Sequence, residues 1–145
     1  MKQQRSQSEC LTFVLGTEQY AIHLLSVQEI RSFEQPTKIA NTPDHMVGVI
    51  NLRGTIVPVV DMRILLHLDQ NKVNTSVVIV VNFEDHVVGF VVDAVSDVVD
   101  IPQSTIKPSP IKVTCSDIIE GIADVDGQMV IVVDNHKLIV RSKIV

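Results

Sequence analysis

Apolar and polar residues alternate over several short stretches of the chain, and this alternation is typical of half-buried β-strands. Leu11, Phe13 and Leu15 fall on one face of the first stretch, because successive side chains of a strand point to opposite sides. Val and Ile dominate the later stretches, and β-branched side chains favour strands over helices. The pattern predicts strands at residues 11–15, 20–24, 47–52, 55–60, 77–83, 87–92 and 95–101.

Two triplets of residues share one spacing. In each triplet the second residue follows the first by six positions and the third follows the second by seven. The triplets are Gly48, Gly54 and Asp61, and Gly121, Gly127 and Asp134. Each triplet fits a strand, a turn containing Gly, a second strand and an Asp that caps a short helix. A unit used twice predicts two similar β lobes, and many short strands with tight turns favour small barrels. Chance similarity between short hairpins is the alternative.

Short helices are predicted at three places in the first half of the chain. Ser26 is a candidate cap for a helical turn over residues 26–30, since a serine hydroxyl accepts from the first helical N–H groups. The Thr-Pro-Asp sequence at residues 42–44 has the order of cap, proline and acid that begins a helix. Asp61 caps a third helix, which we expect to end near residue 68.

The length of 145 residues and a hydrophobic fraction of 46% fit one compact domain or two very small lobes that share a core. We expect a flexible tail at residues 1–9 and one domain at 10–145, with lobes of roughly 10–73 and 74–145. The N-terminal strand could cross between these lobes. Residues 1–9 lack the apolar stretch of a signal peptide, and no apolar run spans a bilayer. We therefore expect a cytoplasmic protein without direct membrane insertion.

Charge and aromatic content argue against nucleic-acid binding. The formal net charge is −5 and aromatic residues make up 3% of the chain. A negative protein is repelled by phosphates and gains little from counterion release. Few aromatic residues are present to stack on bases, so an oligonucleotide-binding barrel is disfavoured.

Residues that could bind a metal ion or take part in catalysis are present but scattered along the sequence. The histidines lie at no metal-ligand spacing, at positions His23, His45, His67, His86 and His136. Cys10 and Cys115 form no C-x-x-C pattern; one disulfide is possible, and a reduced pair is favoured. The acids Asp93, Asp97 and Asp100 fall in a predicted strand and fit a solvated sheet edge.

No known catalytic pattern accompanies these residues. The chain contains no G-x-S-x-G elbow, P-loop or dinucleotide-binding glycine motif. A small β-barrel enzyme would need a nucleophile, a base and an oxyanion donor brought together. We predict no catalytic residue, no metal ligand and no cofactor.

Two segments are more distinctive than the rest of the chain. The first is Val27-Gln28-Glu29-Ile30, and the second runs from residue 48 to residue 63 with the sequence GVINLRGTIVPVVDMR. Together they resemble the V-x-E-I, G-x-x-N-L-R-G and P-x-x-D-[LM]-R motifs of CheW-like domains. The likeness continues through VGFVVDAV at residues 88–95 and resumes at Gly121, covering roughly residues 10–140.

The resemblance implies an all-β fold of two packed five-stranded SH3-like barrel lobes around a shared hydrophobic core, with a few short helices. It also implies a non-enzymatic scaffold that couples the cytoplasmic tip of chemoreceptors (methyl-accepting chemotaxis proteins) to the regulatory domain of the histidine kinase CheA. Such a protein would be monomeric alone. It would be recruited with its partners to membrane-associated receptor arrays.

The resemblance also nominates binding residues. Receptor binding is expected at the groove between the lobes, through Val27, Glu29, Ile30, Gly48, Asn51, Leu52 and Arg53. Kinase binding, or a core position, is expected for Gly89, Val91 and Val92.

The residue types fit this role. Arg53 stands beside Gly54 at a predicted hairpin tip, where a positive φ is needed at Gly54 and a guanidinium can reach a partner carboxylate. Val27 and Ile30 would share an apolar patch on a helical turn, with Glu29 at its rim. The alternative is that both apolar side chains are core and Arg53 is a solvated turn residue.

Overall fold

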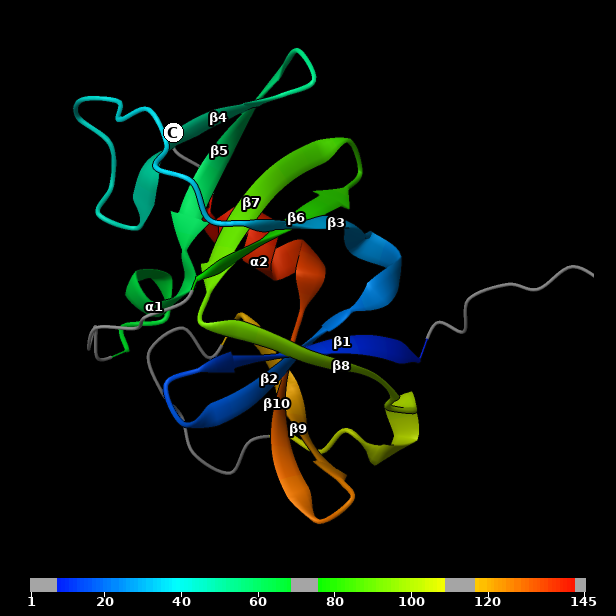
Figure 1. Ribbon diagram of the computed structural model, residues 1–145. Helices are drawn as coiled ribbons and strands as arrows, with labels where there is room; N and C mark the ends of the chain where they lie inside the picture. The colour runs from blue at the N-terminus through cyan, green and yellow to red at the C-terminus, as the bar shows by residue number, and fades with distance from the viewer. Residues whose placement is uncertain (1–7, 69–75, 109–116, 143–145) are drawn as a thin grey trace, which may run out of the picture.

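The structure is a computed structural model that describes residues 8–68, 76–108 and 117–142 (Figure 1). These residues form ten strands, two short α-helices and two 3-10 turns. The strands and helices run in the order β1 (Glu9–Leu15), β2 (Glu18–His23), β3 (Val27–Ser32), β4 (Met46–Leu52), β5 (Thr55–Asp61), α1 (Met62–Leu65), β6 (Val77–Phe83), β7 (His86–Val92), β8 (Ala94–Asp100), β9 (Ile119–Val125), β10 (Gln128–Val133) and α2 (Asn135–Ser142).

The strands form two five-stranded sheets, ordered β3-β6-β7-β5-β4 and β8-β1-β2-β10-β9. We call the first sheet with α1 the first lobe, and the second sheet with α2 the second lobe. Neighbouring strands are antiparallel except for one parallel pair at the same place in each sheet, β5–β7 and β2–β10. The predicted all-β class with two five-stranded lobes and few helices is confirmed.

The two sheets divide the chain differently from the expected boundary near residue 73. Strands β6 and β7 belong to the first lobe, because β6 pairs with β3 and β7 pairs with β5. Both β1 and β2 belong to the second lobe, since β1 pairs with β8 and β2 pairs with β10. The first lobe is therefore one continuous stretch, whereas the second lobe contains both ends of the described chain.

The repeated glycine pattern corresponds to two equivalent hairpins. The turn of the first has φ values of 50° at Arg53 and 90° at Gly54, and the turn at residues 126–127 has 53° and 86°. A side-chain oxygen accepts from the glycine N–H in both turns, Asn51 Oδ1 at 2.7 Å and Asp124 Oδ1 at 2.8 Å. The positive φ predicted at Gly54 is confirmed.

Gly48 and Gly121 occupy equivalent positions at the start of these hairpins. A Cβ at Gly48 would overlap the carbonyl oxygen of Thr37 and lie 2.9 Å from Pro36 Cβ. A Cβ at Gly121 would overlap the carbonyl oxygen of Lys107. In both lobes an incoming segment bridges to the strand beside the glycine, and only a residue without a side chain permits that approach.

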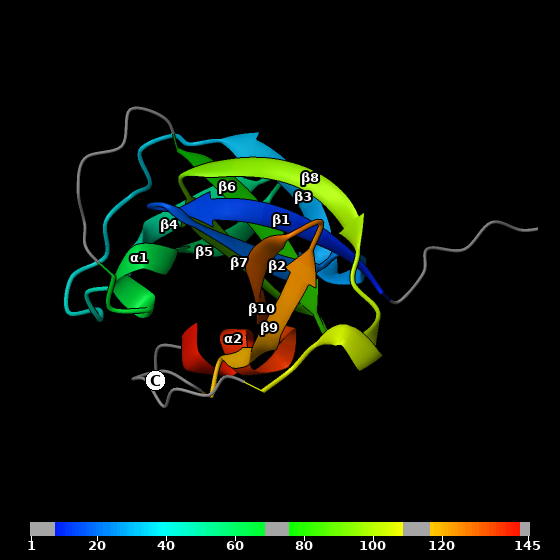
Figure 2. The same ribbon diagram turned by 90° about the horizontal axis from the view of Figure 1, so that it is seen from below.

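The apolar side chains pack into a core shared by the lobes and a smaller core within each lobe. The shared core joins Phe13 of the second lobe to Phe90 of the first, together with Leu138 and Ile139 of α2. Helix α2 lies across the back of both sheets (Figure 2). Each fully buried phenylalanine contributes roughly 2–3 kcal/mol to folding. The predicted shared core is confirmed, and it makes the lobes depend on each other.

Two helix predictions are wrong, and one is confirmed in part. Residues 27–32 form β3 rather than a helical turn, because they pair with β6. Residues 42–44 form no helix, and the Met46 N–H donates to the carbonyl of Pro43 at 3.0 Å in a turn. Asp61 does cap α1, accepting from Arg63 N at 2.9 Å, but the helix ends at Leu65. Strand pairing overrides the local capping signal in the first case.

Asp97 and Asp100 are exposed on β8, at the edge of its sheet, as the sequence predicted. Asp93 is instead buried and paired with Arg63, so the prediction of a solvated edge is wrong for this residue. Cys10 is a buried free thiol. Cys115 and most of residues 1–9 lie outside the described residues, so the cysteine and tail predictions stay predictions.

Candidate partner-binding site

Arg53 joins the two edges of the first-lobe sheet. It lies at the tip of the β4–β5 hairpin and forms an ion pair with Glu29 of β3. Strands β3 and β4 are the opposite edges of this sheet, so the sheet curls until its edges meet. Paired hydrogen bonds of 2.9 Å between Thr37 and Val49 support the same closure. The V-x-E-I and N-L-R-G segments, far apart in the sequence, are thereby brought together.

The pair remains open to solvent, because the side chain of Arg53 is 67% exposed. The hydrogen bond from Arg53 lowers the pKa of Glu29 below its usual value, and Arg31, 3.7 Å away, adds to the effect. The same hydrogen bond raises the pKa of Arg53. The pair is present at neutral pH and is lost as the pH falls through the lowered pKa of Glu29. Exposed pairs add little stability, so this one mainly orients Arg53.

Replacing Arg53 with Ala should raise the pKa of Glu29 toward its ordinary value, because its hydrogen-bond donor is removed. The measurement is an NMR titration of the Glu29 side-chain carboxyl in both proteins. Arg31→Ala is the control and should produce a smaller rise, since Arg31 acts only through its charge. A pKa of Glu29 that does not change in Arg53→Ala would show that the two residues do not pair in solution.

Val27 and Ile30 do not form the apolar patch predicted for a helical turn. Both lie on β3, where Val27 is half-buried and packs against the shared core. Ile30 is 47% exposed, and a β-bulge between Val27 and Glu29 shifts the register so that Ile30 lies opposite Ile79 while Val27 lies opposite Val81. Only Ile30 of the two is free to contact a partner in this conformation.

The other predicted receptor residues have contacts within the lobe. Leu52 is buried in the core of the first lobe. Gly48 is buried against Thr37. Asn51 is exposed, and its side chain accepts from Gly54 N. These three residues shape and hold the hairpin that presents Arg53.

Strand β7, which carries the predicted kinase residues, lies in the middle of the first-lobe sheet. Gly89 and Val92 are buried, and Val91 is half-buried. A Cβ at Gly89 would lie 2.9 Å from Val78 Cγ1. Of the alternatives left open for these residues, the burial of Gly89 and Val92 favours the core position.

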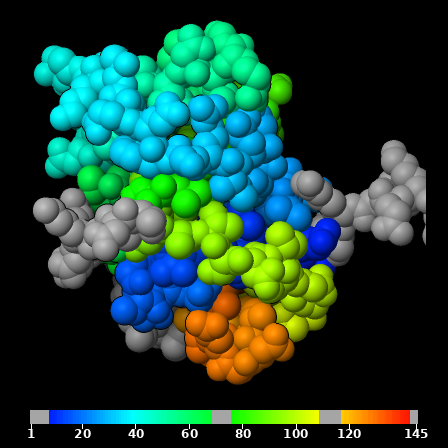
Figure 3. Space-filling view, viewed as in Figure 1, coloured from blue at the N-terminus to red at the C-terminus, as the bar shows by residue number. Residues whose placement is uncertain are grey.

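Edge strands of both lobes share one face of the molecule. Figure 3 shows β3 of the first lobe and β8 of the second on the same side. Each carries one exposed apolar side chain, Ile30 at 47% and Val98 at 45%. Val98 is not among the residues predicted to bind a partner. The sequence predicted only that Val98 lies in a strand. That this strand, β8, is at the edge of its sheet depends on how the sheets assemble.

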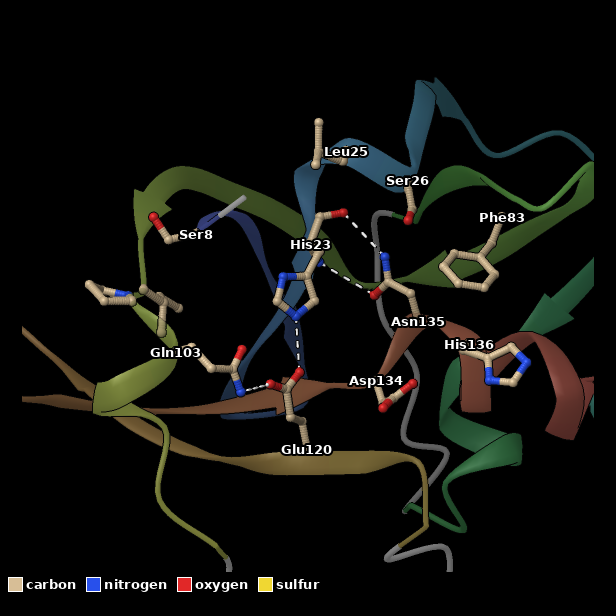
Figure 4. A pocket seen from close by; sticks show the side chains of 12 residues that line it. Ser8, His23, Leu25, Ser26, Phe83, Gln103, Glu120, Asp134, Asn135 and His136 are labelled. Carbon is tan, nitrogen blue, oxygen red and sulfur yellow. Dashed lines mark hydrogen bonds and ion pairs between the residues drawn. The ribbon is translucent and has the colours of Figure 1, made fainter. Parts of the chain in front are cut away.

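A cavity of about 730 Å³ lies elsewhere, between the end of β2, the turn after β6, β9 and the start of α2 (Figure 4). None of the predicted site residues lines it. His23 Nε2 lies 2.9 Å from Glu120 Oε1, and Gln103 donates to the other oxygen of Glu120 at 2.6 Å. Asn135 bonds both the N–H and the carbonyl of His23. These polar groups satisfy one another and tie the parts of the second lobe together.

Cys10, His23 and Glu120 follow one another in the order of a catalytic triad, but Cys10 is unsuited to be a nucleophile. Its Sγ lies 3.9 Å from His23 Nδ1, and the thiol is fully buried. Burial, with the charges of Glu120 and Asp100, raises the pKa of Cys10 to about 11. The thiol therefore stays protonated at neutral pH, whereas nucleophilic cysteines are thiolates.

Within residues 8–68, 76–108 and 117–142, no group of three or more His, Cys, Asp or Glu side chains is arranged to hold a metal ion. In the same part of the chain no helix is long and apolar enough to cross a membrane. The architecture is a two-lobed β domain that presents sheet edges, with the Arg53 guanidinium oriented by Glu29. The chain belongs to the CheW-like domain family, whose model matches residues 9–143. Members of this family are scaffolds of chemotaxis, and the chain is a chemotaxis adaptor.

Individual relatives agree with this assignment. The chain is 46% identical over 138 residues to the chemotaxis protein CheW of Klebsiella aerogenes, covering 90% of the chain and 81% of that protein. It is 32% identical over 135 residues to a probable chemotaxis protein CheW of Rhizobium etli, with 90% and 86% coverage. The crystal structure of the scaffolding protein TtCheW from Thermoanaerobacter tengcongensis superposes with a TM-score of 0.82 at 32% identity, over 89% of this chain and 90% of that one.

Proposed function

We propose that this adaptor joins the cytoplasmic tip of a chemoreceptor to the regulatory domain of the histidine kinase CheA, without catalysis or cofactor. The CheW family couples receptors to this kinase in general. The observation that carries the proposal for this chain is that β3 and β8 lie on one side of the molecule (Figure 3) and that Glu29 of β3 holds Arg53. The free protein is monomeric in this proposal, and it reaches the membrane array through its receptor.

The face suits a helical partner. Ile30 and Val98 supply exposed apolar contacts from the two lobes, and the Glu29–Arg53 pair supplies charge at the same edge of the first-lobe sheet. Apolar anchors with a polar rim are the usual composition of a helix-binding groove. We assign direct receptor contacts to Glu29, Ile30 and Arg53.

The remaining nominated residues act beneath the surface. In this proposal Val27, Gly48, Asn51 and Leu52 hold β3 and the hairpin in the shape that the receptor binds. On the kinase side Val91 is the half-exposed candidate. Gly89 and Val92 support the sheet behind it.

The test is a pull-down with a chemoreceptor cytoplasmic fragment and a kinase regulatory domain, each alone and then together. We expect the wild-type chain to bind each one and to bridge them. Ile30→Ser should weaken receptor binding roughly tenfold, since losing a buried apolar anchor costs about 1–3 kcal/mol, and should spare kinase binding.

Ile39→Ser is the matched control, because Ile39 is also 47% exposed but lies outside β3 and β8. It should leave both interactions unchanged. Equal loss of receptor binding in Ile30→Ser and Ile39→Ser would show that the β3 face is not the receptor interface. Failure of the wild-type chain to bridge the two partners would refute the coupling function itself.

A further inference from the structure

Asp93 stands at the point where the chain passes from one lobe to the other. It is the single residue between β7 of the first lobe and β8 of the second. Its side chain is buried. Figures 1 and 2 both show α1 and the β1–β2 turn close to this crossover. The geometry at Asp93 therefore sets the direction in which the second lobe leaves the first.

Hydrogen bonds from both lobes hold Asp93. On the second-lobe side, its N–H donates to Val14 O at 3.0 Å, and its Oδ2 accepts from Gly16 N at 2.6 Å. On the first-lobe side, Arg63 of α1 donates from Nε to Oδ1 at 2.8 Å and from the terminal guanidinium to Oδ2. The carboxylate is thus shared between a helix of one lobe and a turn of the other.

Such a pair is better suited to fixing geometry than to adding stability. Both side chains are about nine-tenths buried, so the cost of removing two charges from water offsets much of their attraction. A two-pronged guanidinium–carboxylate contact nevertheless allows only one relative orientation of its partners. Arg63 and Asp93 therefore define one angle at the crossover.

We propose that Arg63 is a positioning residue, which acts through Asp93 to set the angle between the lobes and hence the spacing of β3 and β8. This inference rests on the proposed function, in which a receptor spans those two strands. Without the pair, the shared core still holds the lobes together, but their relative orientation becomes broader. A receptor then meets the correct spacing in only a fraction of the molecules, and its apparent affinity falls by that fraction.

The test removes both charges and keeps the contact to Gly16. In the double variant Arg63→Met with Asp93→Asn, the amide oxygen can still accept from Gly16 N, and no unpaired charge remains buried. Nitroxide labels are placed on cysteines introduced at the exposed hairpin positions Thr55 and Gln128, one in each lobe. A Cys115→Ser background is used; the buried Cys10 thiol, with a pKa of about 11, resists labelling.

We expect thermal melting close to wild type, a wider distribution of label distances and receptor binding weakened roughly tenfold, within the range known for coupling mutations. Arg63→Lys keeps the charge but loses the two-pronged geometry, and it should give an intermediate width. An unchanged distance distribution in the double variant would overturn the proposal. Because the distances are measured without receptor, a wild-type chain that fails to bind receptor would refute the proposed function and leave this result standing.

Discussion

Replacing Arg53 with Glu should abolish receptor-stimulated activation of the kinase while the domain stays folded. The exposed guanidinium is held by Glu29, and a second carboxylate at this position would repel Glu29 and strand any partner carboxylate. Breaking such a contact costs about 2–5 kcal/mol when the complex buries it, which corresponds to a loss of well over tenfold in affinity. The measurement is kinase phosphorylation in reconstituted ternary complexes, with circular dichroism of each variant.

Arg141→Glu is the matched control for this variant. Arg141 forms a similar exposed pair with Asp117 in the second lobe, at 2.8 Å, away from β3 and the first hairpin. It should leave activation near the wild-type value. Full activation by Arg53→Glu would show that Arg53 does not contact a partner. Arg53 would then be a solvated turn residue, the alternative left open by the sequence.

Gly48→Ala should destabilise the domain by roughly 3 kcal/mol, a large part of the stability of a chain this size. The added methyl overlaps the backbone of Thr37, and the residue has a φ of 151°, so overpacking and backbone strain add together. The measurement is equilibrium unfolding in urea. Gly121→Ala should also destabilise the domain but by less, because it meets the same kind of overlap, at the Lys107 carbonyl, without a positive φ.

Gly54→Ala separates strain from overlap. Gly54 has a φ of 90°, and nothing lies within 4 Å of the position its Cβ would take. Only the strain remains, so we expect a cost of about 1–2 kcal/mol. If Gly54→Ala proved more damaging than Gly48→Ala, the hairpin turn rather than the neighbouring segment would govern the stability of the lobe.

Local patterns predicted the strands and hairpins well, because these elements depend on residues that are neighbours in the sequence. Alternation marked the strands, and the glycine at Gly54 marked a turn that requires a positive φ. The same reasoning failed at residues 26–30, where a serine typical of helix caps precedes a strand. Pairing with β6, about 50 residues further on, decides that segment. No local signal reports such a partner.

The site residues were reached through the family motifs rather than from physical reasoning on the sequence. The Arg53–Glu29 and Arg63–Asp93 pairs join residues 24 and 30 positions apart. Each depends on how a sheet curls or a lobe crosses over. The sequence showed an acid at Asp93 but could not show that a cation would be buried against it. Ion pairs of this kind depend on the tertiary fold, so they can be identified only from the three-dimensional structure.

The divided second lobe has a consequence for the order of events during folding. The β1–β2 hairpin is made before the first lobe, yet its neighbours β8 and β10 are made after it. An isolated two-stranded hairpin is barely stable in water, whereas the first lobe, at residues 27–92, can form all its strand pairs from one continuous segment. Contacts such as Thr12 with Asp97, 85 residues apart, close late and slow the reaction. The nascent chain thus carries an unfinished half until β9 and β10 have been made, and its apolar Phe13 face is what a chaperone would meet.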